Sequence, residues 1–393
     1  MLAGNVLDEY IISTTPNNFV STIDMDTTVT RDGISTNRAF VMERSSVILF
    51  LKHIVSCNPL KETFNFAQSL SKFSTHMPLH SSDYLTVNVV CIMASALQVF
   101  AVEGITRSIF FYLDLSSLDS LLHVFQATSE LQGYLQDSAL WTELSILHFK
   151  GQRDLELRFL ALPTRDRGWE WTVRERTCVE LQEFLQSMDE RTQFDGTVKI
   201  LEGDIGYING IDRQPLDGIA FPTNSHLTNH YVGAAQAVFR RAGRGLTDHV
   251  NDPSFRGRRP TGSAVATPAF GAGVEKLIHC VGPITMPNCF ELLATTYENA
   301  MSAILHEELS CVTMASISTG NMGVPCDEGA QVALRTIQKF LRANHWDGKL
   351  AIVCYDEPVL NAFAKQKQAV LDRFNETLDL PVVTQDNLPR WPF

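Results

Sequence analysis

The sequence lacks the cysteine spacings that are typical of zinc-binding proteins and the basic character that is typical of nucleic-acid-binding proteins. Its eight cysteines form no Cys-x-x-Cys pair and no pair with histidine at zinc-finger spacing. They are scattered among apolar neighbours, so we expect reduced core thiols of ordinary reactivity and no metal site. Lysine and arginine number 32 against 44 acidic residues, and the net charge of -12 argues against nucleic acid as a partner.

Long uninterrupted apolar runs and a secretory leader are also missing. The longest apolar stretch, 85–102, is interrupted by Thr86, Asn88, Ser95 and Gln98. We interpret this stretch as buried core and expect no membrane partner. The N-terminus has no positive charge ahead of an apolar run, so no secretory signal is predicted and an intracellular location, cytoplasmic or nuclear, is expected.

The length and composition indicate a globular, two-domain protein. A chain of 393 residues is too long for one ordinary hydrophobic core. An apolar share of 45% and a charged share of 19% exclude the composition of disordered chains. The character of the sequence changes near residues 193–196. We therefore place an N-terminal domain at 1–190, a second domain at 191–380 and a C-terminal tail at 381–393.

The first half contains few glycines and no catalytic constellation. Helical spacing predicts helices over 115–135 and 180–188, whereas 144–150 and 155–162 resemble short strands. A mostly helical domain and an α+β domain both stay open, and the strands favour the latter. The tryptophan-containing turn 164–171 is interpreted as part of an amphipathic strand, with a stacking face as the alternative. We expect this half to offer a surface to a protein partner.

From Val198 onward, short strands alternate with helices. Strands are predicted over 198–201, 218–221, 277–281, 312–316 and 350–354, and helices over 233–242, 289–305, 327–342 and 359–374. This alternation predicts an α/β fold, in which a sheet is covered by helices on both faces. Ligands of such sheets bind beyond the carboxyl ends of the strands.

Five loops at those strand ends contain the informative side chains. Asp204 can accept a hydrogen bond from an exocyclic amine such as that of adenine, and Asn224 offers an amide that both donates and accepts. Gly233 permits close approach of the backbone, and the loop 316–323 offers backbone N–H groups to a phosphate. Tyr355 supplies an aromatic wall. Each feature is weak alone, but their order and spacing together predict a nucleotide-binding cleft.

In this order the segments resemble the macro domain family, over residues 196 to 374. The matching pieces are Gly203-Asp204-Ile205, 217–224, Arg241-Ala242-Gly243, Gly262-Ser263-Ala264, 277–283 and 316–325. The last two are the most specific, and the pattern is most similar to that of histone-variant macro domains. The resemblance implies a three-layer domain, with a mixed sheet between helices, that binds ADP-ribose in a cleft at the strand ends.

The resemblance also implies a role for each matching residue. Asp204 would hold the adenine amine, with Ile205 and Tyr355 near the ring, and Asn224 would face the distal ribose. The two diphosphate loops would comprise Gly233 and Ala234 in the first and Ser318, Thr319, Gly320, Asn321, Met322 and Gly323 in the second. Thr267, Pro268, Ala269 and His279 are interpreted as sheet architecture. ADP-ribose is the expected ligand, and no cofactor is expected.

Departures from the family pattern bear on the reaction. Hydrolytic members carry an acidic residue after a glycine run, and the matching position here is Ala235. Phe221 replaces the first Asn of the Asn-Ala-Ala-Asn motif, and Gly233 alone remains of the glycine run. No glutamate pair marks the poly-ADP-ribose glycohydrolase type. Because a positioned base contributes roughly 10²- to 10⁴-fold, we favour binding of ADP-ribose or ADP-ribosylated protein over catalysis.

Two alternative functions, and the role of one basic stretch, stay open. The same fold could remove ADP-ribose or a 1''-phosphate, or deacetylate O-acetyl-ADP-ribose, as an enzyme. A degenerate macro domain could instead serve as an interaction module. Six arginines between Arg240 and Arg259 lie mostly in a segment, 243–260, that we interpret as a solvated insertion loop. The alternative for this segment is contact with a polymer phosphate or a nucleic acid.

Overall fold

The computed structural model describes residues 21–23, 40–42, 103–127, 129–153, 177–377 and 379–382. The chain divides into two compact units, residues 1–135 and 136–393. The boundary predicted between 190 and 191 lies inside the second unit and stays a prediction for the limits of the α/β domain. The predicted strand 155–162, the tryptophan turn 164–171 and the apolar stretch 85–102 lie outside the described residues.

The described part of the first unit contains a short antiparallel strand pair and helices. These elements are β1 (Ser21–Ile23), β2 (Phe40–Met42), α4 (Glu103–Tyr112), α5 (Leu115–Ala127) and, running into the second unit, the 3-10 helix η1 (Ser129–Gln136). α5 begins where the side chain of Asp114 accepts a hydrogen bond from the Ser117 backbone N–H at 2.8 Å. Phe110 and Leu118 are fully buried. The helix predicted over 115–135 is confirmed, although its second part is a 3-10 helix.

Helix α6 (Ser138–Phe149) overturns one prediction, because the segment 144–150 forms its last part and the following cap rather than a strand. The helix begins where the side chain of Asp137 accepts a hydrogen bond from the Leu140 N–H at 3.0 Å. It ends at Lys150, whose φ of 59° is left-handed. A short apolar run does not distinguish a strand from a buried helix, and here the helical spacing decides. The buried residues are Leu140, Trp141, Leu144, Ser145 and Phe149.

The second unit is built around a six-stranded mixed sheet. Its strands are β3 (Val198–Glu202), β6 (Gly218–Pro222), β7 (Ala264–Pro268), β8 (Lys276–Cys280), β9 (Cys311–Ala315) and β10 (Lys349–Cys354). They lie in the order β3-β10-β9-β6-β8-β7, and only the edge strand β7 is antiparallel to its neighbour. The five predicted strands are confirmed. Because these five are parallel, their carboxyl ends meet at one edge of the sheet, which we call the carboxyl edge.

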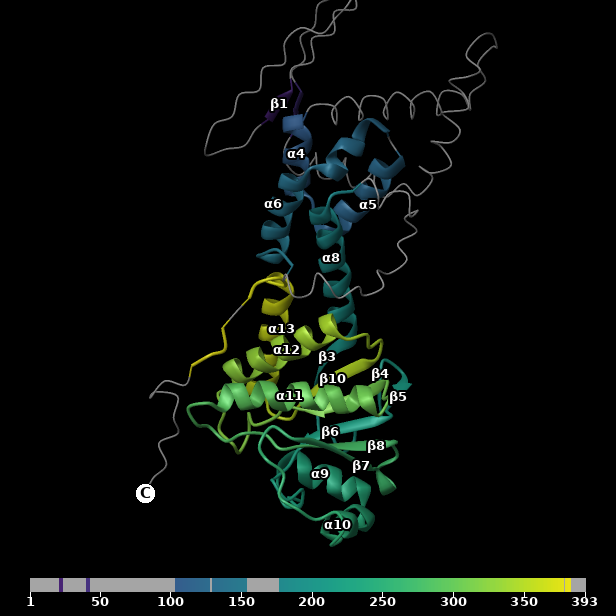
Figure 1. Cartoon of the computed structure of the whole chain (residues 1–393), viewed down its shortest axis with the longest axis vertical. Helices are drawn as coiled ribbons and strands as arrows, with labels where there is room; N and C mark the ends of the chain where they lie inside the picture. The colour runs from purple at the N-terminus through teal and green to yellow at the C-terminus, as the bar shows by residue number, and fades with distance from the viewer. Residues whose placement is uncertain are drawn as a thin grey trace, which may run out of the picture. The chain divides into compact units, whose positions relative to one another are not determined.

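Helices cover both faces of this sheet, which confirms the predicted three-layer α/β architecture. They are α8 (Val179–Thr197), α9 (Gly233–Ala242), α10 (Arg244–Asn251), α11 (Cys289–His306), α12 (Cys326–Ala343) and α13 (Glu357–Asp372). Figure 1 shows α9 and α10 gathered on one side of the strands and α11 and α12 on the other. Buried residues of α9 and α10 share one core cluster with alternate residues of β6, β8, β9 and β10.

Helix α10 and a small hairpin were not predicted. α10 occupies the first part of the segment 243–260, which therefore is not a loop throughout. Leu246 and Val250, four residues apart, are buried against the core beside α9, and this burial explains the helix. The hairpin joins β4 (Gly210–Ile211) to β5 (Gln214–Pro215).

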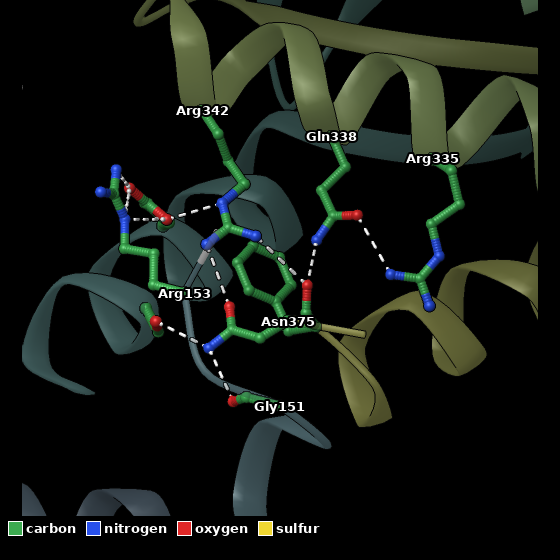
Figure 2. A network of polar contacts seen from close by, with 9 residues as sticks. Gly151, Arg153, Arg335, Gln338, Arg342 and Asn375 are labelled. Atoms are coloured by element: carbon green, nitrogen blue, oxygen red, sulfur yellow. Dashed lines mark hydrogen bonds and ion pairs between the residues drawn. The ribbon is translucent and has the colours of Figure 1, made fainter. Parts of the chain in front are cut away.

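A buried polar network connects the segment after α6 and helix α8 with α12 and the segment after α13 (Figure 2). The carboxylate of Glu190 accepts hydrogen bonds from Arg153 and from Arg342, both at 2.8 Å. Arg342 also donates to the side chain of Asn375 at 3.0 Å, and Asn375 donates to Ser187 at 3.0 Å. Because buried charges are stable only when paired, this network fixes α8 against α12.

Two expectations from the composition can be checked in the described residues. Their six cysteines are free, and four of them are buried: Cys280, Cys289, Cys311 and Cys354. Burial raises the pKa of Cys280 and of Cys354 to about 12, which agrees with the expectation of core thiols. None of the described helices is long and apolar enough to cross a membrane.

Candidate ligand-binding site

The loops that contain the predicted site residues meet at the carboxyl edge. The Gly203 N–H donates to the Cys354 carbonyl at 3.0 Å, which ties the loop after β3 to the loop after β10. The Thr285 N–H donates to the Met322 carbonyl at 3.0 Å, which ties the segment after β8 to the loop after β9. Three strand spacings separate β3 from β6, or roughly 14 Å at the usual spacing. The site is therefore elongated along the edge.

Asp204 lies at the β3 end of the site, in a tight turn. Its Oδ1 accepts the Gly206 N–H at 2.8 Å, while its Oδ2 lies 3.6 Å from a guanidinium nitrogen of Arg240 on α9. The pair is partly exposed, so a ligand amine can compete for Oδ2. The Arg240 guanidinium also lies over the exposed ring of Tyr207, 5.6 Å from its centroid.

Ile205 and Tyr355, predicted near the same end, have opposite exposures. Ile205 is 3% exposed and belongs to the core cluster, so its side chain packs inward. Tyr355 is 75% exposed beside the β3 loop, because β10 is the neighbour of β3. Of the two side chains, only Tyr355 is therefore accessible to a ligand.

Asn224, after β6, has an amide that is oriented by its own loop. Its Oδ1 accepts the backbone N–H groups of His226 at 3.1 Å and Thr228 at 3.0 Å. Its Nδ2 lies 3.4 Å from the Thr228 hydroxyl. The amide oxygen is thus engaged, and the second hydrogen on Nδ2 is the group that the side chain can offer to a ligand.

The N-terminus of α9 follows this loop and has the properties of an anion site. Gly233 has a φ of 60°, is exposed and has no atom near the position of a Cβ. Ala234 is half-buried. No described side chain caps the helix, and its first turn holds no acidic residue, so its first N–H groups can receive an anion. Ala235 is 2% exposed and faces the core rather than the loops.

The loop after β9 combines a buried start with an exposed end. Ser318 has a φ of 66° and, like Thr319, is buried, and neither hydroxyl has a hydrogen-bond partner among the described residues. A backbone bond from the Val324 N–H to the Ser318 carbonyl, 3.1 Å, closes the loop. The exposed members are Gly320, Asn321, Met322 and Gly323. The loop therefore presents the backbone of residues 320–323 to a ligand, while Ser318 and Thr319 support it from below.

The replacement of the motif asparagine by Phe221 affects the core rather than the surface. Phe221 is fully buried, with its ring centroid 4.6 Å from that of His279 and 6.3 Å from that of Phe239. His279 Nε2 lies 3.1 Å from the Thr267 hydroxyl, and burial lowers the pKa of His279 to about 3. His279 is thus a neutral residue between two strands, as the interpretation of sheet architecture requires.

Sequence reasoning missed His230, which lies between Asn224 and α9. Its Nδ1 is 2.8 Å from the Thr228 carbonyl oxygen. Because a carbonyl only accepts, Nδ1 carries the hydrogen, and Nε2 keeps a free lone pair in the neutral ring. The ring lies against Tyr231 at a centroid distance of 3.8 Å. No spacing in the sequence indicates this tautomer, since it depends on how the loop folds back.

Exposed apolar side chains are concentrated in the same loops. Clusters of such groups on a protein surface are typical of binding sites. The exposed large apolar residues of the carboxyl-edge loops are Tyr207, Tyr231, Val232, Ile284, Met286, Met322 and Tyr355.

Comparisons with known proteins agree with this architecture. The family model named Macro domain matches residues 221–333. The O-acetyl-ADP-ribose deacetylase of Salmonella typhimurium is 29% identical over 172 residues, 43% of this chain and 92% of that protein. The Escherichia coli K12 protein of the same name is 31% identical over 129 residues, 32% of this chain and 73% of that protein. Through its C-terminal half, the chain belongs to the macro domain family.

Solved structures include similar chains. The Oceanobacillus iheyensis macrodomain with ADP is 29% identical to this chain, with a TM-score of 0.40 over 45% of this chain and 92% of its own. The predicted resemblance to the macro domain family is confirmed by the family model and the curated relatives.

Proposed function

We propose that the macro domain of this chain binds ADP-ribose, free or attached to a protein, along the carboxyl edge of its sheet. The observations that carry this proposal are the N-terminus of α9, which no described side chain caps, and the exposed loop 320–323 at the same edge of the sheet. The backbone N–H groups of a helix N-terminus and of a glycine-containing loop bind anions. A diphosphate has the matching charge and acceptor atoms.

The two ends of the elongated site suit the two ends of ADP-ribose. At the β3 end, Asp204 Oδ2 accepts the adenine amine, and Tyr355 covers the ring. In the middle, the loop 318–323 and the N-terminus of α9 donate backbone N–H groups to the diphosphate. At the β6 end, the Nδ2 of Asn224 donates to a hydroxyl of the distal ribose.

Binding rather than turnover is the main function that we propose. The position that holds an acidic residue in hydrolytic members is Ala235 here, and its side chain is buried in the core. No carboxylate at this position can therefore orient a water molecule. Recognition of an ADP-ribosylated protein needs only the binding groups described above.

Hydrolysis of an ester of ADP-ribose is the second candidate function. Two observations favour it: the curated relatives are named O-acetyl-ADP-ribose deacetylases, and His230 keeps a free Nε2 next to the Asn224 loop. A neutral imidazole with Nδ1–H fixed by a carbonyl can accept a proton from water at Nε2.

Titration calorimetry with ADP-ribose, followed by a turnover assay on the same sample, tests both candidates. Binding without release of acetate from O-acetyl-ADP-ribose supports recognition. Turnover that is lost in His230→Ala, with ADP-ribose affinity retained, supports hydrolysis. A folded chain that binds no ADP-ribose contradicts both candidates. The remaining hypothesis is then a degenerate macro domain that serves as an interaction module.

A further inference from the structure

Two exposed arginines, without a side-chain partner in the described part of the chain, lie on one segment beside the candidate site. We define the arginine segment as residues 252–260, which follow α10. Arg256 and Arg258 are exposed, and neither guanidinium has a partner among the residues that the structure describes. Arg259 differs, because it donates to the Phe255 carbonyl at 3.1 Å and lies 5.6 Å from the Phe255 ring centroid. Within a chain of net charge -12, these two free arginines form a local positive patch.

The arginine segment is attached to the β6 end of the carboxyl edge. The Arg259 N–H donates to the Ser225 carbonyl at 2.7 Å, one residue after Asn224. Just beyond the segment, the Gly262 N–H donates to the Val281 carbonyl at 2.8 Å, at the end of β8. The backbone of the segment therefore runs beside the place where, under the proposed function, the distal ribose lies. Under the proposed function, a group attached to that ribose leaves the site beside the arginine segment.

The neighbouring aromatic residue indicates what the patch can bind. A further nucleotide unit would need both a cationic group and an aromatic face for its base. Phe255, the aromatic residue of the segment, already lies against the His249 ring at 4.4 Å and beneath the Arg259 guanidinium. Its ring is thus engaged within the chain. The two exposed arginines offer charge and forked donors, which suit carboxylates and phosphates alike. Because the segment offers no free aromatic face for a base, we favour carboxylates over a further nucleotide unit.

We propose that Arg256 and Arg258 bind acidic side chains of the protein segment to which ADP-ribose is attached. This inference rests on the proposed function and adds a preference for a class of target: ADP-ribosylated sites with Asp or Glu nearby. The ADP-ribose occupies the carboxyl edge, and the flanking carboxylates pair with the arginine segment.

The test uses the full chain and three peptides that carry ADP-ribose through the same non-hydrolysable linkage. The modified residue is flanked by Glu in the first peptide, by Gln in the second and by Lys in the third. We expect affinity to fall in that order, and about threefold to thirtyfold stronger binding of the Glu peptide than of the Gln peptide. The preference decreases with added salt.

The variant Arg256→Ala/Arg258→Ala removes the preference and leaves the affinity for free ADP-ribose unchanged. The matched control, Arg213→Asn/Lys339→Ala, removes two exposed charges elsewhere and keeps the preference; Asn suits the φ of 71° at position 213. Equal affinities of the three peptides for the native chain overturn the inference alone. A preference for the Glu peptide that survives in the Arg256/Arg258 variant also overturns the inference. So does a variant whose affinity falls for ADP-ribose polymer and stays the same for the three peptides. Absence of free ADP-ribose binding instead overturns the proposed function and the inference with it.

Discussion

Gly282 packs against Ser318 so closely that a Cβ on Gly282 would overlap the Ser318 hydroxyl and come 2.6 Å from Ile317 Cγ2. The end of β8 is thus complementary to the loop after β9. We expect Gly282→Ala to displace that loop, to destabilise the fold by about 1–3 kcal/mol and to weaken ADP-ribose binding roughly tenfold or more. Thermal unfolding and calorimetry measure the two effects. The control Gly196→Ala, in α8 and outside the site, has a Cβ that meets nothing within 4 Å and keeps both values near those of the native chain.

Asp204 provides a test of the adenine end. In Asp204→Asn the side-chain oxygen can still accept the Gly206 N–H, but an NH₂ group replaces the oxygen available to the adenine amine. We expect ADP-ribose affinity to fall roughly tenfold to hundredfold, since a hydrogen bond to a charged group is lost, while the unfolding midpoint changes little. An unchanged dissociation constant in the folded variant means that Asp204 does not face the base.

Gly320→Glu tests the diphosphate loop by charge and by bulk. A carboxylate in this exposed loop repels the diphosphate and obstructs the backbone N–H groups, so we expect binding to be abolished with the fold intact. Arg258→Glu is the comparison, because it reverses a charge in the arginine segment and leaves free ADP-ribose binding nearly unchanged. If Arg258→Glu abolishes ADP-ribose binding and Gly320→Glu does not, the ligand lies on the arginine segment.

Glu190 tests the coupling of α8 to α12. Glu190→Ala leaves the buried guanidiniums of Arg153 and Arg342 without their shared carboxylate, so we expect a loss of about 3–5 kcal/mol in the free energy of unfolding. Urea denaturation measures it. Glu298→Ala, at an exposed position of α11, stays within about 0.5 kcal/mol of the native value.

The same network bears on the predicted domain boundary. A fragment that begins at residue 136 keeps Glu190 and Arg153, whereas a fragment that begins at 191 lacks both. We expect the longer fragment to unfold at the higher temperature and to bind ADP-ribose. Equal unfolding temperatures of the two fragments would support a boundary at 190/191.

His279 gives the fold a pH dependence. Burial lowers the pKa of His279 from 6.5 to about 3, so the unfolded chain binds more protons between these values. The contribution to stability is present above pH 6.5 and is lost as the pH falls toward 3, by at most about 1.4 kcal/mol per pH unit. We expect the free energy of unfolding of His279→Gln, measured by urea denaturation at pH 7, 6 and 5, to depend less on pH than that of the native chain. Ser302→Ala, at an exposed position and without a titratable side chain, keeps the native slope.

The sequence predicted the parallel part of the fold because five buried apolar strands are each followed by a polar or glycine-containing loop. It assigned Thr267 and Pro268 to the sheet but did not predict β7 as a strand, because this strand is mostly half-buried, has few large apolar side chains and ends in Pro268. Nor did it predict the network around Glu190, because Arg342 lies 152 residues away in sequence and no local pattern records that pairing. The burial of Phe221 and of Ala235 likewise depends on packing between elements.

Hydrogen exchange of the full chain with and without ADP-ribose tests the central claim most directly. We predict that ADP-ribose slows exchange in the loops 203–207, 230–235 and 318–323 at the carboxyl edge. The hollow beside the β4–β5 hairpin, lined by Lys199, Asp212 and Lys367 among others, serves as the internal comparison and stays unchanged. Protection of that hollow or of the arginine segment, with no change in the three loops, would contradict the account.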